Sequence, residues 1–253
     1  MQKLTNMKPY YEEKNIQLYC ADWQEILPEL KEETVGLLCT DPPYATTNLQ
    51  WDKPVNWVLF WQCVERLCKW YATQILFSSG LFTNKLINTN PKHFRYELIW
   101  EKTMPTGFLD ANRRPLRAHE NILFFIHRPK ASIYNPQFIA GKLHKRGSEG
   151  TRALHYGSHR KTASVTTNKY HPRSIIRFPN ARCGKSLHPT MKPLHLIEFL
   201  IRSYSNRGHL VLDPFVGSGT TLLATKRTGR RAIGIEREEK YCEIAAKRLR
   251  GEL

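Results

Sequence analysis

Short apolar runs alternate along the chain with segments in which apolar residues recur at helical spacing. Five runs are apolar at both alternating positions, as strands covered on both faces would be: 16–20, 35–40, 74–78, 96–100 and 121–127. Helical spacing is seen in two sets between them, namely Trp23, Ile26, Leu27 and Leu30, and then Leu59, Cys63, Leu67 and Trp70. This alternation predicts βαβ units.

The same alternation resumes in the last third of the chain. Apolar residues at helical spacing predict a helix carrying Leu194, Ile197, Ile201 and Tyr204. A strand at 209–215, a helix at 220–228, a strand at 230–236 and a closing helix at 238–250 are expected to follow. Together, the two ends predict one α/β domain built on an open, mostly parallel, doubly wound sheet.

The segment between them has a different composition. Residues 129–185 are rich in Gly, Ser, Thr, Asn and basic residues and show no sustained periodicity, so we expect loops there. We therefore divide the chain into one half of the main domain at 1–128, a basic region at 129–185 and the other half at 186–253.

The charge is also uneven. The chain has 39 Lys and Arg against 22 Asp and Glu, a net charge of +17. Residues 102–187 contain 17 of the basic residues but only three of the acidic ones, and six of the ten histidines. Cations of this density, mixed with aromatic rings, suit the phosphates and bases of nucleic acid. The alternative is a solvated basic loop region with no partner.

Composition excludes several other classes of protein. No apolar stretch approaches the roughly 20 residues that span a bilayer, and the first residues lack the apolar core of a signal peptide. The six cysteines are scattered without a CxxC pair, which is typical of a reducing compartment. We expect a cytoplasmic protein without a membrane partner.

A glycine-rich turn follows the predicted strand at 209–215. In "VLDPFVGSGTT", Gly217 and Gly219 would let a ligand approach the backbone, although Leu222 stands where GxGxxG has its third glycine. A tight turn without a ligand is the alternative. Glu236 closes the next strand, where an acidic side chain typically accepts hydrogen bonds from ribose hydroxyls. This context predicts a nucleoside cofactor.

Two residues flank this turn. Asp213 could meet a positive group of the cofactor, or could simply cap the end of its strand. Phe215 could cover an adenine or a sulfonium.

The earlier stretch "VGLLCTDPPY" has the same design, an apolar strand that ends in polar residues. Asp41 and the carbonyl groups beside Pro42 and Pro43 form a set of acceptors without donors, because proline has no N–H. Such a set suits an amino group, and the Tyr44 ring could support a flat base. A plain Pro-Pro turn is the alternative.

These motifs, in this order, resemble the S-adenosylmethionine-dependent DNA amino methyltransferases of the beta subgroup, which modify adenine N6 or cytosine N4. "DPPY" is similar to the catalytic motif, "LDPFVGSGTT" to the methionine-binding loop and "HPTMKP" at 188–193 to the motif before that loop. Met191 departs from the glutamine common in the last of these. The resemblance implies a Rossmann-like class I methyltransferase fold, with the variable basic region recognising the target sequence.

The resemblance also implies a role for each site residue. Asp41 and the Pro42 carbonyl would accept the amino hydrogens of a base flipped out of DNA, Pro43 would stiffen the turn, and Tyr44 would stack on the base. S-adenosylmethionine would be held by a set comprising Asp22, Lys192, Pro193, Asp213, Phe215, Gly217, Gly219, Thr220 and Glu236. No metal is implied.

Adenine N6 is the expected target, because members that modify it usually carry aspartate in the first motif position. Cytosine N4, an amino group of RNA or protein, and a catalytically silent DNA-binding protein are the alternatives. The resemblance implies double-stranded DNA as partner in a bacterial or phage-encoded cytoplasmic protein, and it admits a homodimer and a cognate restriction endonuclease.

Overall fold

The computed structural model describes residues 7–45, 52–148, 152–153, 157–158, 162–181 and 191–253. The chain forms two compact units. One comprises Met1–Asn135 with Ser174–Leu253, and the other comprises Pro136–Arg173. Among the described residues, no helix combines the length and the apolar composition needed to cross a membrane.

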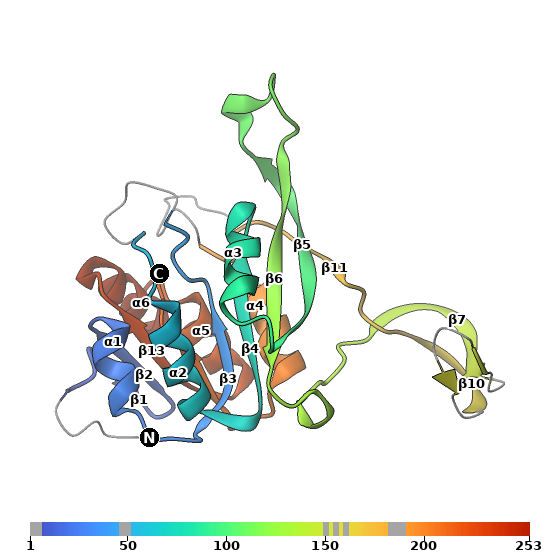
Figure 1. Ribbon diagram of the computed structural model, residues 1–253, viewed down its shortest axis with the longest axis horizontal. Coiled ribbons are helices and arrows are strands. Elements are labelled where there is room, and N and C mark those ends of the chain that lie inside the picture. The colour runs from blue at the N-terminus through green and yellow to red at the C-terminus, as the bar shows by residue number, and fades with distance from the viewer. Residues whose placement is uncertain (1–6, 46–51, 149–151, 154–156, 159–161, 182–190) are drawn as a thin grey trace. The chain divides into compact units, whose positions relative to one another are not determined.

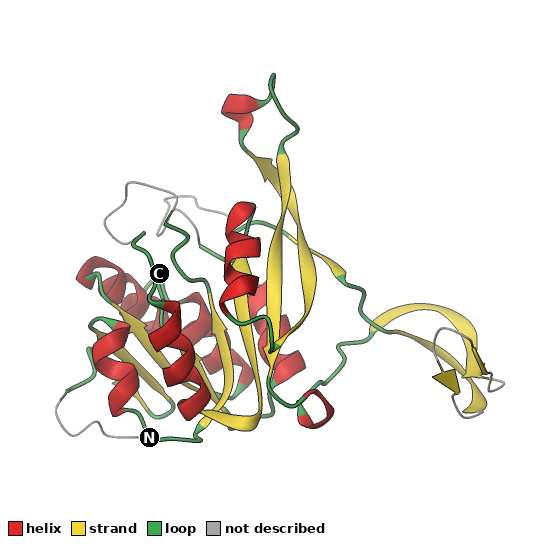
Figure 2. Cartoon of the chain, viewed as in Figure 1, coloured by secondary structure: helices red, strands yellow, loops and turns green. Residues whose placement is uncertain are grey.

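The first unit is built on a nine-stranded sheet (Figures 1 and 2). From one edge to the other, its strands are β1 (Tyr11–Glu13), β2 (Ile16–Cys20), β13 (Arg231–Glu236), β12 (Leu210–Asp213), β3 (Val35–Thr40), β4 (Cys68–Ser78), β6 (Arg117–Ile126), β5 (Phe94–Thr106) and β11 (Ile175–Phe178). The run from β2 to β4 is parallel throughout, as is the β5–β11 pair. β6 is antiparallel to both neighbours, and β1 to β2. The mostly parallel α/β sheet is confirmed.

Helices cover both faces of this sheet (Figure 1). They are α1 (Trp23–Ile26), α2 (Trp57–Leu67), α3 (Leu81–Thr89), α4 (Leu194–Tyr204), α5 (Thr220–Thr228) and α6 (Glu239–Arg250). Adjacent strand residues serve opposite faces: Leu38 packs in the cluster with α1, α2 and α3, whereas Leu37 packs in the cluster with α4. Both faces are therefore apolar, which explains the continuous apolar runs.

The structure corrects the predicted elements in two places. α2 ends at Leu67 and β4 begins at Cys68, so Trp70 lies on a strand, 53% exposed, and not on the helix. Two aromatic residues and a threonine within five positions favour an extended chain there. α3 was not predicted, because only Phe82, Thr83 and Leu86 of its nine residues are buried.

The second unit contains strands where loops were expected. β7 (Ile139–Ser148) pairs antiparallel with β10 (Thr162–Tyr170), and β8 (Arg152–Ala153) pairs with β9 (Gly157–Ser158). The expectation of loops throughout 129–185 is therefore wrong. β11 also falls in that range but belongs to the main sheet. Nearly every described side chain of β10 is exposed, so its sequence lacks the alternation that marks a half-buried strand.

Candidate functional site

A cavity of about 510 Å³ opens at the carboxyl ends of the parallel strands. Four carboxylates reach its walls from four neighbouring strands: Asp22 follows β2, Asp41 follows β3, Asp213 ends β12 and Glu236 ends β13. Parallel strands bring their carboxyl ends to one edge of a sheet, where open α/β folds bind ligands. Residues from both ends of the chain thus share one cavity.

Most of the predicted site residues line this cavity. They are Asp22, Asp41, Pro42, Pro43, Tyr44, Lys192, Asp213, Phe215, Gly217, Thr220 and Glu236. Gly219 and Pro193 are not among the lining residues; Pro193 directly precedes α4 and accepts a hydrogen bond from the Ile197 amide (3.2 Å). His188, Pro189 and Thr190 of the "HPTMKP" motif lie outside the described residues.

Both carboxylate oxygens of Asp41 accept hydrogen bonds. The Tyr44 hydroxyl donates to Oδ1 (3.0 Å), and the Lys192 ammonium donates to Oδ2 in a very short contact. The Tyr44 ring stacks on Phe82, with centroids 4.5 Å apart and planes inclined by 19°. Asp41 is therefore fixed in orientation by one neutral and one charged donor.

Lys192 links Asp41 to a second carboxylate. Its Nζ lies 3.3 Å from Glu120 Oε2, and the other oxygen of Glu120 lies 2.5 Å from Lys102 Nζ. The Lys192 side chain is only 9% exposed and its ammonium also lies over the Phe77 ring, 5.1 Å from the centroid. Two carboxylates and two ammonium groups alternate along one wall of the cavity.

The charges in this row set each other's ionisation. Burial raises the pKa of Asp41, an effect that Lys192 opposes and Glu120 reinforces. Burial would also raise the pKa of Glu120, but Lys192 and Lys102 outweigh it and the pKa lies below its usual value. Burial would lower the pKa of Lys192, yet the two carboxylates raise it. Lys192 is therefore charged at neutral pH and favours the ionised form of Asp41.

Asp213 ties the two strand ends together. Its Oδ1 accepts a hydrogen bond from the Thr40 hydroxyl (2.5 Å) at the end of β3 and another from the Phe215 amide (3.0 Å). Burial raises the pKa of Asp213 to about 6. Asp213 thus caps its strand, as the simpler interpretation held, while it also lines the cavity.

Glu236 shapes the glycine-rich turn. Its Oε2 accepts from the Gly217 amide (2.8 Å) and its Oε1 from the Glu238 amide (2.9 Å). Burial raises its pKa, which those amides oppose. Asp22 also lines the cavity while it accepts a backbone hydrogen bond: its Oδ1 accepts from the Gln24 amide (2.9 Å), which caps α1. Each oxygen can accept a further hydrogen bond, so both carboxylates keep capacity for a ligand.

The two glycines of the turn have different roles. Gly217 lines the cavity, as expected. Gly219 has φ of 85°, and a Cβ built on it would lie 2.7 Å from the Cβ of Ala245 on α6. The backbone conformation of Gly219 and the close packing of α6 both require a glycine here.

Several residues that shape the site were not predicted. Arg248 of α6 is buried and donates through Nη1 to the Ser218 carbonyl (2.5 Å) and to the Thr220 hydroxyl (3.1 Å), which holds the turn from behind. Asp52 Oδ1 accepts a hydrogen bond from the amide of Ala45 (2.7 Å), the residue directly after Tyr44. Ala45 has a positive φ of 54°. Glu120 and Lys102 complete the set. A charged residue beside the apolar run 121–127 was the one available signal for Glu120.

Comparison with known proteins gives a family match. The model of a family described as "DNA methylase" matches residues 35–247. The chain is 52% identical over 258 residues to the type II methyltransferase M.HinfI of Haemophilus influenzae, covering 91% of this chain and 67% of that one. It is 29% identical to M2.DpnII of Streptococcus pneumoniae, covering 97% and 93% of the two chains.

Solved structures agree with these matches. The M1.HpyAVI complex with SAM superposes with a TM-score of 0.65 at 28% identity, over 92% of this chain and 99% of that one. The PvuII cytosine-N4-specific DNA methyltransferase superposes with a TM-score of 0.67 at 19% identity, over 97% and 96%, which shows a shared fold.

Proposed function

Because the chain belongs to the DNA methylase family of S-adenosylmethionine-dependent amino methyltransferases, we propose that it methylates adenine N6 at specific sites in double-stranded DNA. The observation that carries this proposal is the position of Asp41. This carboxylate lies directly after β3 and lines the same cavity as the glycine-rich turn. Aspartate in the first position of the "DPPY" motif favours adenine over cytosine, as the resemblance implies.

The residues of the cavity fit S-adenosylmethionine. Asp22 and Glu236 offer carboxylate oxygens to ribose hydroxyls or an adenine amino group, and the Phe215 ring offers an apolar wall. Phe215 is held by Phe60, whose ring is nearly parallel at 6.2 Å. Bound S-adenosylmethionine supplies the methyl group.

The target base has to leave the duplex to reach Asp41, at a cost of a few kcal/mol in lost stacking and pairing. In the proposed complex, Asp41 and the Pro42 carbonyl accept the two hydrogens of the exocyclic amino group, while the Tyr44 ring supports the base. These acceptors draw the nitrogen lone pair out of conjugation and orient it for attack. Catalysis is then mainly orientation and electrostatics. Loss of the methyl group would convert the sulfonium into a neutral thioether, and the surplus proton on the methylated nitrogen would then pass to Asp41 or to water.

Lys192, predicted to help hold the cofactor, also contacts Asp41. Its ammonium bonds to Asp41 and lies beside Glu120, so we propose that it keeps Asp41 ionised. Its ammonium donates to Oδ2 of Asp41, and the Tyr44 hydroxyl donates to Oδ1. The incoming base must therefore share Asp41 with Lys192, or shift Lys192 towards Glu120.

The deciding experiment is methyl transfer from labelled S-adenosylmethionine to unmethylated double-stranded DNA, followed by nucleoside analysis. We expect N6-methyladenine. N4-methylcytosine would overturn the base assignment, and absence of label from DNA would leave a silent DNA-binding protein as the better interpretation.

A variant separates the two halves of the cavity. Asp41→Ala removes the acceptor for the amino group, so methyl transfer should fall by about a hundredfold to a thousandfold. S-adenosylmethionine affinity, measured by calorimetry, should stay within about threefold of wild type, since none of the cofactor-side residues is changed. Loss of cofactor affinity instead would show that this division of the cavity is wrong.

A further inference from the structure

The β5–β6 hairpin extends from the wall of the cavity into solvent. Figure 1 shows the two strands continuing beyond α3 as a twisted ribbon. Its stem contributes Lys102, Thr106 and Glu120 to the cavity, and the strands pair as far as Thr106 and Arg117. The hairpin is thus continuous with the proposed target-base site.

The outer part of this hairpin is apolar and exposed. Phe108 is 77% exposed, Leu109 is 87% exposed and Met104 is 67% exposed. None of the three belongs to a hydrophobic cluster of the described residues. Large apolar side chains gathered at one exposed position usually mark a binding surface.

The tip is ordered, although it is exposed. Phe108–Asp110 forms a 3₁₀ turn after Gly107, which has φ of 89°. The Asp110 carbonyl accepts from the Arg113 amide (2.8 Å) and the Arg114 amide (3.0 Å), and the Asp110 carboxylate pairs with Arg114. Phe108 and Leu109 are therefore presented on a fixed turn, which lowers the entropy cost of inserting them into a partner.

Charge identifies the partner. Three exposed cations, Arg113, Arg114 and Arg117, follow the apolar tip, and Asp110 is the only acidic residue between positions 103 and 117. Cations suit DNA phosphates, while apolar side chains inserted between base steps unstack them. The tip therefore combines the two kinds of side chain that a protein needs to enter a DNA duplex.

We propose that Phe108 and Leu109 form a wedge that enters duplex DNA beside the target base and fills the space left when the base turns into the cavity. This rests on the proposed function. The wedge offsets part of the cost of base extrusion, so it matters most when the target base is paired.

The test uses the double variant Phe108→Ala, Leu109→Ala and the site that the wild-type enzyme methylates, mapped in plasmid DNA. On a duplex with the target base paired, methylation should fall by about tenfold or more. On the same duplex with the target base mispaired, methylation should return to within about threefold of wild type, because a mispaired base needs less help to leave the stack. Ile175→Ala, which removes an exposed side chain from the neighbouring strand β11, should leave both rates unchanged.

Equal losses on the paired and mispaired duplexes would overturn the wedge and indicate simple loss of affinity. No loss on either would also overturn it. Unchanged S-adenosylmethionine affinity shows that the variant is folded. If the wild-type enzyme itself methylates no DNA, the proposed function fails, and that result is distinct from failure of the wedge.

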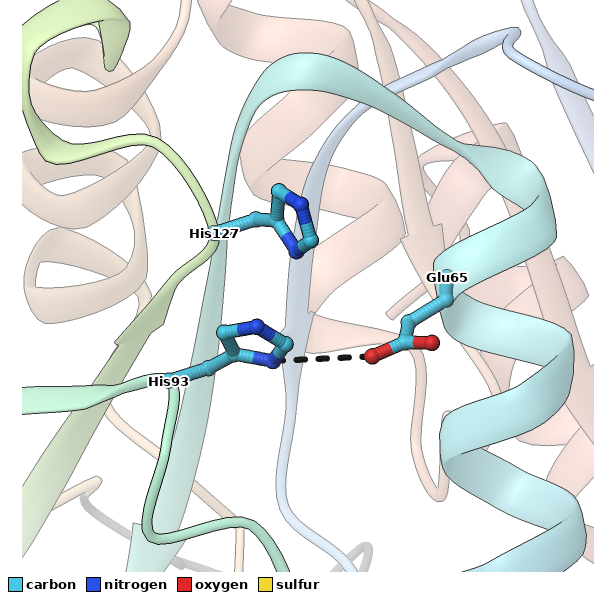
Figure 3. A group of neighbouring side chains, drawn as sticks. All are labelled: Glu65, His93 and His127. Carbon is cyan, nitrogen blue, oxygen red and sulfur yellow. Dashed lines mark ion pairs between the residues drawn. The ribbon is translucent and has the colours of Figure 1, made fainter.

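A second cluster carries an independent inference at the opposite end of the central strands. Figure 3 shows Glu65 of α2, His93 before β5 and His127 after β6 pointing toward one another. Their possible ligand atoms all lie within 4.8 Å of one another, and His93 Nδ1 is 3.5 Å from a Glu65 oxygen. Because β6 is antiparallel to β4, its carboxyl end lies far along the sheet from Asp41.

We infer that these three side chains bind a divalent transition-metal ion such as Zn²⁺. Two imidazoles and a carboxylate are a common donor set for Zn²⁺ and Co²⁺. His93 is buried and tied to the sheet, since its carbonyl accepts from the Ile126 amide (2.8 Å). Glu65 and His127 are exposed, so water can complete the coordination.

Calorimetry with Zn²⁺ and visible absorption with Co²⁺ on the full chain test this site. His127→Ala should weaken the binding of one Zn²⁺ by about tenfold or more. His195→Ala is the matched control, because His195 also lies 3.5 Å from a glutamate, Glu198, but belongs to no such three-ligand group among the described residues. Equal affinity in both variants, or absence of Zn²⁺ binding by the wild type, would overturn the site.

Discussion

Lys192 contacts the carboxylates of Asp41 and Glu120, so the ionisation of Asp41 depends on a residue 151 positions away. Asp41 accepts an amino hydrogen well only when it is ionised. Methyl transfer should therefore fall as the pH drops through the pKa of Asp41, which burial raises, Lys192 lowers and Glu120 raises.

Two variants should move this acid limb in opposite directions. Lys192→Met removes the positive neighbour, raises the pKa of Asp41 and shifts the acid limb to higher pH, with a loss of about tenfold or more at neutral pH. Glu120→Gln removes a negative neighbour, lowers the pKa of Asp41 and shifts the limb to lower pH. The measurement is a pH profile of single-turnover methyl transfer.

Lys102→Met is the control for this pair, because Lys102 contacts Glu120 but is not among the groups that shift Asp41. A shift of the same sign for Lys192→Met and Glu120→Gln would contradict the electrostatic role and favour a steric one.

The sequence predicted which residues line the cavity better than it predicted the contacts that each of them makes. Asp41 and Tyr44 were predicted to hold the target base and Glu236 to bind the cofactor. All three line one cavity, because each lies at the carboxyl end of an apolar strand. The Tyr44 hydroxyl bond and the contacts of Lys192 depend on side-chain directions across distant segments, which a motif does not contain. The contact of Gly219 with Ala245 was not predicted, because it joins two helices whose packing the motif does not specify.

At the scale of elements, the turn between β12 and α5 is fixed from the side of α6. Gly219→Ala combines a strained positive φ with a Cβ 2.7 Å from Ala245, so we expect a loss of about 2–4 kcal/mol in unfolding free energy. Thermal or urea unfolding without cofactor measures it.

Gly208→Ala provides the matched control for this loss. Gly208 also has positive φ, 79°, but a Cβ there would meet nothing within 4 Å. Its cost should be about 1 kcal/mol, from backbone conformation alone. Equal losses for the two variants would contradict the packing role of Gly219.

Elements with two covered faces were easy to predict, and those with exposed faces were not. β2, β3 and α5 were predicted with the bounds they have, because their burial is complete or strongly one-sided. β10 exposes nearly all its side chains, so nothing in its pattern distinguishes it from a loop. The antiparallel direction of β6 was also not predicted, since an apolar run does not indicate the direction in which its strand runs in the sheet.

At the scale of the whole molecule, the +17 net charge predicts DNA affinity that falls steeply with salt. β7 carries three exposed cations of the second unit, Lys142, Lys145 and Arg146. Replacing all three by glutamine should weaken binding to duplex DNA of any sequence and reduce the salt slope by up to about 0.9 for each phosphate that is no longer neutralised. S-adenosylmethionine affinity should not change.

Replacing Lys8, Lys31 and Lys240 by glutamine makes the same change in net charge on exposed residues of the first unit. If this control lowers the salt slope equally, the effect belongs to the overall charge. In that event, the expectation that the basic region at 129–185 recognises DNA loses its support.

The strand order of the main sheet has a consequence for synthesis of the enzyme. β12 and β13, formed by residues 210–236, lie between β2 and β3, which are formed by residues 16–40. When the "DPPY" motif of a nascent chain has left the ribosome, the chain still lacks the middle strands of its sheet. At that stage Asp41 has neither Lys192 nor the glycine-rich turn beside it. Methylation can therefore begin only when β12 and β13 have been translated and inserted between β2 and β3. An unfinished chain does not methylate DNA.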